Sequence, residues 1–274
     1  MIFHSRALGL CVLFLAVAAS PVWAQTAPAP YEPKMGQQGR DVVWIPSPQD
    51  MVEKMLDMAR VTPRDYVIDL GSGDGRNVIG AARRGARALG VEYNPDLVAL
   101  SRRAAAAAGV ADKAVFVQGD MFAADISDAT ALILFLIPSN LEKLAPKFLD
   151  LKPGTRIVSN TYEIGGGWEP DDTDALKPCA TWCVGYLYIV PAKVAGTWRL
   201  QQGELTLEQA FQRISGTYDA HGIRLPIENG LLRGNEIHFT VNAVHYSGRV
   251  SGDAIEGVAK GRTTSTWTAR RSRD

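Results

Sequence analysis

Short apolar runs alternate with helix-like patterns of apolar residues between residues 47 and 161. The runs that predict strands cover residues 66–70, 88–91, 114–118, 131–137 and 155–161. The helices predicted between them cover residues 77–84, 95–108 and 139–149. A further helix is expected before the first strand, where apolar residues from Met51 to Ala59 recur on one face. Ser47 is expected to cap that helix, and Asn94 the helix over residues 95–108.

The predicted strands are apolar throughout, which is typical of a parallel sheet covered by helices on both faces. Right-handed crossovers then place the first and fourth strands side by side. In sheets of this kind ligands bind outside the carboxyl ends of the strands, where the direction of winding reverses. We therefore expect a ligand site between the ends of the first, second and fourth strands.

The pattern changes after residue 161. Residues 162–178 contain three consecutive glycines and a pair of aspartates, and they predict a loop. Residues 184–190 and 197–200 predict an antiparallel hairpin that closes the sheet. From residue 205 onward, short alternating runs are separated by turn residues about every eight to twelve positions. The sequence therefore predicts an α/β fold followed by a C-terminal antiparallel β module.

The N-terminus has the pattern of a secretory signal. Arg6 precedes an apolar run, and a site of small residues ending at Ala24 predicts cleavage there. We expect a signal peptide over residues 1–24, a flexible leader over residues 25–40, and an exported protein that is periplasmic or secreted. The run is short for a membrane span, so no stable insertion is expected after cleavage. An uncleaved anchor and a cytosolic protein translated from Met35 are the alternatives.

Charge and composition narrow the range of partners. The chain of 274 residues carries 29 basic and 29 acidic side chains, so no strong field favours nucleic acid or an anionic membrane. The histidines share no ligand spacing, and no metal site is expected. Cys179 and Cys183 could pair in an oxidising compartment or remain thiols, and the sequence leaves both states open.

The segment over residues 69–75, Asp-Leu-Gly-Ser-Gly-Asp-Gly, carries the strongest chemical signal. It joins a predicted strand to a helix, and its glycines let a ligand approach backbone amides closely. Glu92 ends the next strand, where a carboxylate can accept both hydroxyls of a ribose. Together they predict a nucleoside-bearing cofactor. A dinucleotide motif would place its third glycine at Arg76, so it fits less well, and a glycine turn without a ligand is the other alternative.

The form acid-x-Gly-x-Gly-x-Gly resembles the first motif of the class I S-adenosylmethionine (SAM) methyltransferases. Trp44-Ile-Pro-Ser-Pro48 and Phe135-Leu-Ile-Pro138 narrow the resemblance to a subgroup. This subgroup includes the lysine methyltransferases of mitochondrial ATP-synthase and nucleotide-carrier subunits. The resemblance covers roughly residues 41–162. It implies a Rossmann-like seven-strand methyltransferase sheet in a domain over residues 41–203, with the antiparallel β module over residues 204–274.

The resemblance also implies roles for single residues. Glu92 would hold the ribose, Asp120 would accept the adenine amino group, and Met121 would lie beside the ring. The segment around Pro46 would close over the cofactor, and Phe135 to Pro138 would line the methyl-transfer face. The full set of expected SAM-binding residues is Pro46, Asp69, Gly71, Ser72, Gly73, Asp74, Gly75, Glu92, Tyr93, Asp120, Met121, Phe135 and Leu136.

The resemblance suggests a protein lysine amine as methyl acceptor. Asn160, Tyr162 and Glu163 follow the fifth predicted strand and are expected to line the acceptor channel, where the amine must lose a proton. Trp44 and Trp168 could offer aromatic faces to a cation, with core packing as the competing interpretation. Two other functions stay open. The first is methylation of a small molecule. The second is cofactor binding without catalysis, because SAM is made in the cytosol and a chain exported unfolded cannot carry it across the membrane.

Overall fold

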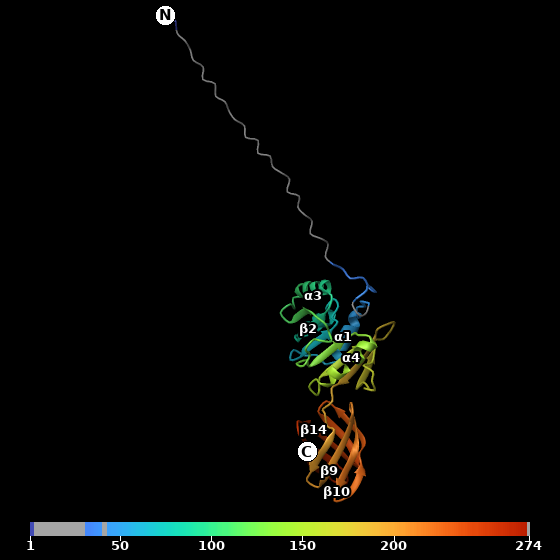
Figure 1. Cartoon of the computed structure of the whole chain (residues 1–274). Coiled ribbons are helices and arrows are strands. Elements are labelled where there is room, and N and C mark those ends of the chain that lie inside the picture. The colour runs from blue at the N-terminus through green and yellow to red at the C-terminus, as the bar shows by residue number, and fades with distance from the viewer. Residues whose placement is uncertain (3–30, 40–42, 273–274) are drawn as a thin grey trace. The chain divides into compact units, whose positions relative to one another are not determined.

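The computed structural model describes residues 1–2, 31–39 and 43–272 of the chain (Figure 1). Nearly all of the predicted signal peptide lies outside the described residues. None of the helices in the described part is long and apolar enough to cross a membrane.

The first sheet has seven strands in the order β3-β2-β1-β4-β5-β7-β6. Its strands are β1 (Tyr66–Leu70), β2 (Arg87–Glu92), β3 (Ala114–Gln118), β4 (Ala131–Leu134), β5 (Arg156–Asn160), β6 (Asp172–Ala175) and β7 (Val184–Ile189). Strands β1 to β5 pair in parallel, whereas β7 pairs antiparallel with both β5 and β6. Because β1 lies between β2 and β4, the predicted neighbourhood of the first and fourth strands is confirmed.

Helices cover both faces of this sheet. They are α1 (Gln49–Met58), α2 (Arg76–Arg83), α3 (Pro95–Ala107) and α4 (Pro138–Leu149). Apolar residues of α1, α2 and α3 form one core cluster with the sheet, and those of α4 form a second cluster. Successive strand residues point to opposite faces, so Val67 lies in the first cluster and Ile68 in the second. Burial on both faces explains why a central strand such as β4 is apolar throughout, whereas Val115 and Val117 of the edge strand β3 are exposed.

The helix starts agree only partly with the sequence. The side chain of Asn94 accepts a hydrogen bond from the Asp96 amide at 2.9 Å, so its predicted capping role is confirmed. The predicted cap at Ser47 is wrong, because α1 begins at Gln49 and Pro48 occupies the cap position. The Ser47 hydroxyl accepts a hydrogen bond from the Asn160 side chain at 3.2 Å instead. A contact between distant segments therefore takes the place of the local cap.

The segment after β5 departs from two predictions. The stretch expected to be a loop contains β6, which pairs with β7 as the edge of the first sheet. The hairpin predicted from residues 184–190 and 197–200 is wrong, because β8 (Gly196–Leu200) belongs to the second sheet and pairs with β9 and β16. Leu187 packs in the core of the first sheet, whereas Trp198 packs in that of the second. The residues between these strands thus cross between two cores.

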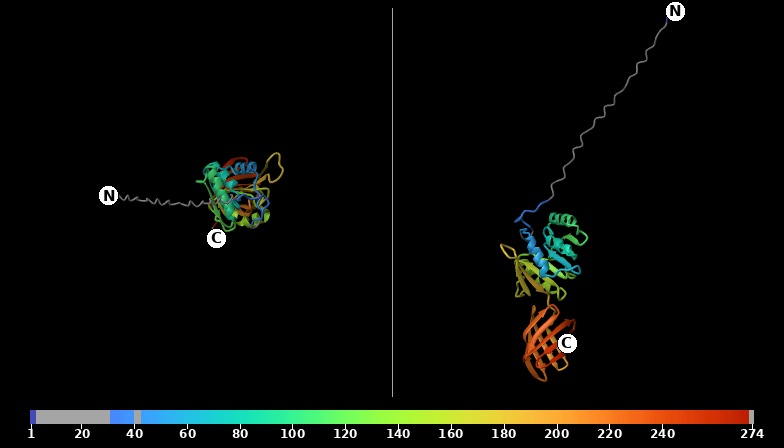
Figure 2. Two further views of the ribbon diagram at one scale, coloured as in Figure 1. Left: turned by 90° about the horizontal axis from the view of Figure 1, so that it is seen from above. Right: turned by 180° about the vertical axis from the view of Figure 1, so that it is seen from behind.

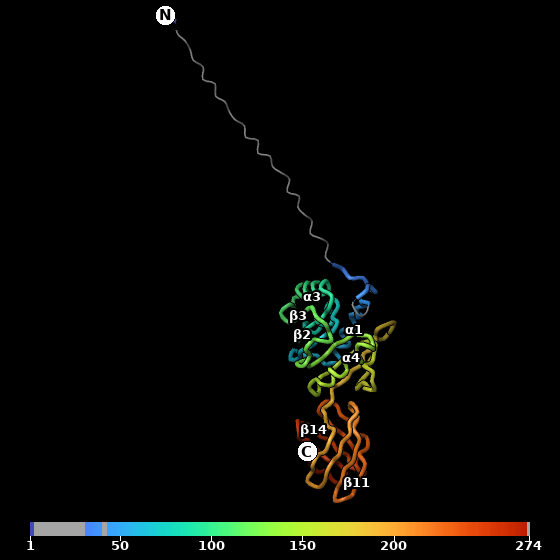
Figure 3. Tube along the Cα trace, viewed as in Figure 1, coloured from blue at the N-terminus to red at the C-terminus, as the bar shows by residue number. Residues whose placement is uncertain are grey.

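The second sheet is antiparallel and contains β8 to β16. The strands after β8 are β9 (Gly203–Ala210), β10 (Arg213–Ala220), β11 (Ile223–Pro226), β12 (Glu228–Arg233), β13 (Glu236–Val241), β14 (Val244–Ser251), β15 (Ala254–Lys260) and β16 (Thr264–Arg271). Pairing of β9 with β10 closes the sheet into a barrel, and β11 and β12 pair one after the other with the opposite edge of β10. Figures 2 and 3 show these strands in orange and red. The predicted antiparallel β module is confirmed, and β8 adds a strand ahead of the expected boundary at residue 203.

Candidate functional site

The glycine motif forms a tight turn between β1 and α2. Gly71, Gly73 and Gly75 have φ values of +73°, +55° and +83°, which side chains rarely tolerate. A Cβ atom added at Gly73 would lie 2.8 Å from the Trp44 Nε1 atom, and one at Gly75 would lie 2.7 Å from the ring of Phe116. Both the backbone angles and the crowding therefore require glycine in this turn.

The amides of the turn bind the end of β2. We expected them to face a ligand, but those of Gly71 and Ser72 donate to the Val91 carbonyl at 2.8 and 3.1 Å. The Gly73 amide donates to Glu92 Oε2 at 2.9 Å, and the Asn94 amide donates to Glu92 Oε1 at 2.9 Å. A carboxylate offers about four lone pairs, so two remain on Glu92 after these bonds. The turn thus fixes the carboxylate in one orientation with acceptor capacity left over.

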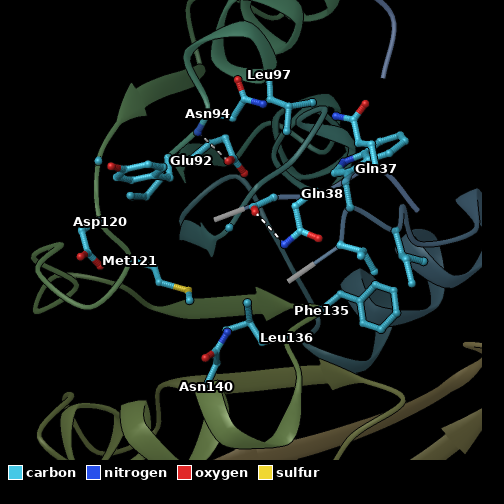
Figure 4. Close-up of a pocket in the computed structure, with 18 of the residues that line it drawn as sticks. Gln37, Gln38, Glu92, Asn94, Leu97, Asp120, Met121, Phe135, Leu136 and Asn140 are labelled. Atoms are coloured by element: carbon cyan, nitrogen blue, oxygen red, sulfur yellow. Dashed lines mark hydrogen bonds between the residues drawn. The ribbon is translucent and has the colours of Figure 1, made fainter. Parts of the chain in front are cut away.

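A cavity of about 420 Å³ opens beside this carboxylate. Its volume falls in the range of about 300–1,000 Å³ that is usual for small-molecule sites. Among the predicted cofactor residues, those that line it are Gly71, Glu92, Tyr93, Asp120, Met121, Phe135 and Leu136. Figure 4 shows Asp120 and Met121 on the side of the cavity opposite Phe135, with Glu92 and Asn94 above them. Acidic acceptors and an aromatic wall therefore lie at different ends of one cavity.

Asp69 is buried beneath the glycine turn, with 2% of its surface exposed. Burial raises the pKa of its carboxyl group well above the usual range, and the nearby charges of Glu92 and Asp74 add to this effect. The Asn77 side chain donates to Asp69 Oδ2 at 3.0 Å and acts in the opposite direction. Asp69 does not line the cavity.

Asp74 takes part in a contact that joins the glycine turn to Ser47, the residue after Pro46 in the segment before α1. Asp74 pairs with Arg76 at 2.5 Å, and the Arg76 guanidinium also donates to the Ser47 carbonyl. Pro46 is half-buried in that segment. These two residues do not line the cavity, and neither do Ser72, Gly73 and Gly75. Their predicted contacts with the cofactor stay predictions.

The residues predicted for the acceptor channel lie outside the cavity lining. Asn160 is completely buried and donates to Ser47 Oγ. Tyr162 is half-buried with its amide bonded to the Asn160 carbonyl at 2.8 Å, and Glu163 is exposed. Their catalytic roles stay predictions. Of the two tryptophans considered for cation binding, Trp44 lines the cavity, whereas Trp168 is a core residue stacked on Phe211.

Sequence reasoning missed several residues that line the cavity. Gln37 and Gln38 fall in the predicted flexible leader, but residues 34–38 form a turn whose strand-like bridge joins Gln38 to Val43. The Trp44 amide donates to the Gln37 carbonyl at 2.9 Å. Asn140 lines the cavity from the first turn of α4 and is 7% exposed. Its position two residues after Pro138, close to the end of the fourth strand, could have indicated in the sequence that it lines the cavity.

Two further expectations concern cysteines and metals. Cys179 and Cys183 form a disulfide, which decides between the two states that the sequence left open. Within residues 31–39 and 43–272, the structure contains no group of three or more His, Cys, Asp or Glu side chains that could hold a metal ion.

Known proteins resemble the part of the chain that contains this cavity. An RNA methyltransferase from Salinibacter ruber, solved with S-adenosyl-L-homocysteine (SAH), is 45% identical with a TM-score of 0.52, and the match covers 55% of this chain and 96% of that one. A protein-lysine N-methyltransferase from Saccharolobus islandicus is 38% identical over 152 residues, which are 54% of this chain and 94% of that protein. An adenine nucleotide translocase lysine N-methyltransferase from Mus musculus is 35% identical over 131 residues, 47% of this chain. The match spans little more than half of the mouse protein's length, 56%.

The cavity fits SAM, whose demethylated product SAH is bound in the Salinibacter ruber structure. Glu92 presents two free acceptor positions for a ribose, and a side chain on Gly71 would meet Leu136 at 3.3 Å in the space a ligand needs. The protein is a class I SAM-dependent methyltransferase. The sequence family described as the ANTKMT methyltransferase domain matches residues 69–172. Because the archaeal relative is matched over nearly its whole length, the chain belongs to this family.

Proposed function

We propose that the protein transfers the methyl group of SAM to the side-chain amine of a lysine in another protein. The observation that carries the proposal is the 38% identity to the archaeal protein-lysine N-methyltransferase over 94% of its length. The mouse relative, named as a lysine methyltransferase of the adenine nucleotide translocase, supports the same acceptor chemistry.

The walls of the cavity suit this reaction. SAM, when bound, supplies a methyl group on a sulfonium, whose leaving group is a neutral thioether. The cavity is lined by Trp44, Ile45, Phe135 and Leu136, all apolar or aromatic, which would face the methyl group. Apolar surroundings lower the pKa of a lysine amine and so favour the neutral nucleophile. Glu92 would hold the ribose at the other end, so that alignment supplies most of the rate.

A nucleic-acid acceptor is the competing possibility, since the relative from Salinibacter ruber is called an RNA methyltransferase. Proteins that bind RNA through its phosphates need an excess of basic side chains. This chain has 29 basic and 29 acidic side chains. The balance of charge therefore favours a protein acceptor over RNA.

Radiolabelling tests the proposal. The purified protein is incubated with tritiated SAM and, in separate reactions, with bacterial protein extract, total RNA and the small-molecule fraction. We expect label in protein, recovered after acid hydrolysis as N-methylated lysine, and less of it with the Glu92→Ala variant when SAM is limiting. Label confined to RNA or to small molecules contradicts the lysine proposal. SAM binding without transfer to any fraction would instead identify a nucleoside-binding protein without catalysis.

We also propose that the protein is exported, with residues 1–24 removed as a signal peptide. The disulfide between Cys179 and Cys183 supports this, because such bonds persist in oxidising compartments and are rare in the cytosol. Fractionation of the source cells with N-terminal sequencing tests it. A mature N-terminus at Gln25 in the periplasm or medium is expected, and a cytosolic protein beginning at Met1 or Met35 would contradict it.

A further inference from the structure

A disulfide closes the loop between β6 and β7. The two strands pair up to Ala175 and Val184, and the Leu176 amide adds a hydrogen bond to the Cys183 carbonyl at 2.9 Å. Cys179 and Cys183, with Cα atoms 5.7 Å apart, join across the loop. Only Ala180, Thr181 and Trp182 lie between them. The disulfide therefore constrains a ring of very few residues that includes one large aromatic side chain.

Trp182 has an uncommon backbone conformation for a bulky residue. Its φ of +52° lies in the left-handed region, where residues other than glycine, asparagine and aspartate are rare. Such conformations persist where the surrounding structure holds them, often at functional sites. Here the neighbouring disulfide and the hydrogen bond at the end of the ladder supply that restraint.

The ring of Trp182 packs against the ring of Phe135. Their centroids are 6.3 Å apart and their planes are inclined by 55°. Phe135 directly follows β4 and lines the cavity, whereas Trp182 does not reach the lining. Figure 4 places Phe135 at the end of the cavity away from Asp120, which is the end left for the methyl group and its acceptor. Trp182 thus supports the aromatic wall of this end from behind.

We propose that Trp182 is a positioning residue for the methyl acceptor. It holds the Phe135 ring where the aliphatic stem and the ammonium of an incoming lysine pass, and the Cys179–Cys183 disulfide holds Trp182. An aromatic face attracts a cation as well as apolar surface, so a fixed ring favours this acceptor over an uncharged one. The inference rests on the proposed lysine methylation. It adds that the oxidised loop sets the affinity for the acceptor and not that for SAM.

Steady-state kinetics with poly-L-lysine as the acceptor tests this inference in the full mature chain. Trp182→Ala is expected to raise the acceptor KM about tenfold, while kcat and the calorimetric Kd for SAM stay within about twofold. Trp182→Phe should recover most of the lost affinity, because it restores a ring beside Phe135. Thr181→Ala is the matched control, since this exposed residue lies within the same disulfide ring. It should leave all three constants unchanged.

The disulfide is tested with Cys179→Ser and by reduction with dithiothreitol. In the reduction, dithiothreitol is oxidised to its cyclic disulfide while Cys179 and Cys183 each gain a proton and become thiols. Both treatments should raise the acceptor KM in the same direction as Trp182→Ala, and neither should add to the effect of that variant.

Three outcomes would overturn the inference. The first is an unchanged acceptor KM in Trp182→Ala. The second is a loss of SAM affinity equal to the loss of acceptor affinity, which would indicate a general structural role. The third is a failure of Trp182→Phe to restore the KM. If Trp182→Ala does not fold, Cys179→Ser and reduction still decide the question. If the unchanged protein transfers no methyl group to lysine in either poly-L-lysine or protein extract, the proposed function is overturned, and this inference with it.

Discussion

Replacing Glu92 with alanine tests the assignment of the ribose site. In the structure each carboxylate oxygen accepts one backbone amide, from Gly73 on one side and from Asn94 on the other, both at 2.9 Å. One lone pair on each oxygen is then left for a ribose hydroxyl. The substitution removes both of these acceptors and releases the two amides to the cavity, where water can bind them.

The magnitude follows from the number and kind of these bonds. A hydrogen bond to a charged group contributes about 1.5–3 kcal/mol net, and water in the variant's cavity partly replaces what is lost. We therefore expect Glu92→Ala to weaken SAM binding by about 1–3 kcal/mol, or about 5- to 150-fold in Kd. Glu92→Gln should lose a comparable amount, because its amide group must place an N–H against one of the two backbone donors.

Isothermal titration calorimetry with SAM and with SAH measures the effect. Both ligands carry the same ribose, so both should lose the same factor. Glu204→Ala is a matched control, since Glu204 is an exposed glutamate on β9 of the barrel. A folded Glu92→Ala variant with SAM affinity within about twofold of the unchanged protein would refute the assignment.

Three further substitutions test the fold of the first sheet and the glycine turn. Burial raises the pKa of Asp69, so ionising its carboxyl group destabilises the folded protein as pH rises above the ordinary aspartate pKa. Asp69→Asn should therefore raise the Tm near pH 7 by about 2–6 °C, and a lowered Tm would contradict this. Burial raises the pKa of Asp65, but hydrogen bonds from Thr130, Thr62 and Arg156 outweigh it and hold the pKa below its usual range. Its stabilisation is therefore complete above the ordinary aspartate pKa and lost as pH falls through the lowered value, so Asp65→Asn should cost about 1–3 kcal/mol in urea unfolding near pH 7 and less near pH 3. Gly75→Ala should lower the free energy of unfolding by about 2–4 kcal/mol, because the new Cβ atom would clash with the Phe116 ring and the φ of +83° is strained for alanine. A decrease of less than about 0.5 kcal/mol in urea unfolding would contradict the clash.

The first sheet could be predicted from the sequence because its strands are marked locally. Runs such as residues 66–70 and 114–118 are apolar and bounded by turns, and the structure has strands at the same residues. The Asn94 cap is equally local, since acceptor and donor are two residues apart. The strand pairing of residues 184–200 could not be predicted in this way, because it depends on residues far away in the sequence. Whether β8 pairs with β7 or with the barrel depends on which core takes Trp198, and that core is built from later residues.

The residues of the site also divide into those marked by neighbouring residues and those that depend on contacts with distant ones. Glu92 and Gly71 were found because strand, turn and acid follow one another in the sequence, and both line the cavity. Gln38 could not be found, because only its bridge to Val43 brings it there. Asn160 is a different case, and its role in the acceptor channel stays a prediction. It is the last residue of β5, and its buried side chain donates to the Ser47 hydroxyl, a contact with the segment before α1 that no local pattern indicates.

Every role assigned to the site depends on a SAM-shaped slot between the ends of β1, β2 and β4. A crystal structure of the protein with SAH would show whether the ligand occupies this slot. We expect the ribose hydroxyls within hydrogen-bond distance of the Glu92 carboxylate, the adenine near Asp120 and Met121, and the sulfur directed toward Phe135. Density for the ligand at another place, or a Glu92 carboxylate without contact to the ribose, would contradict it.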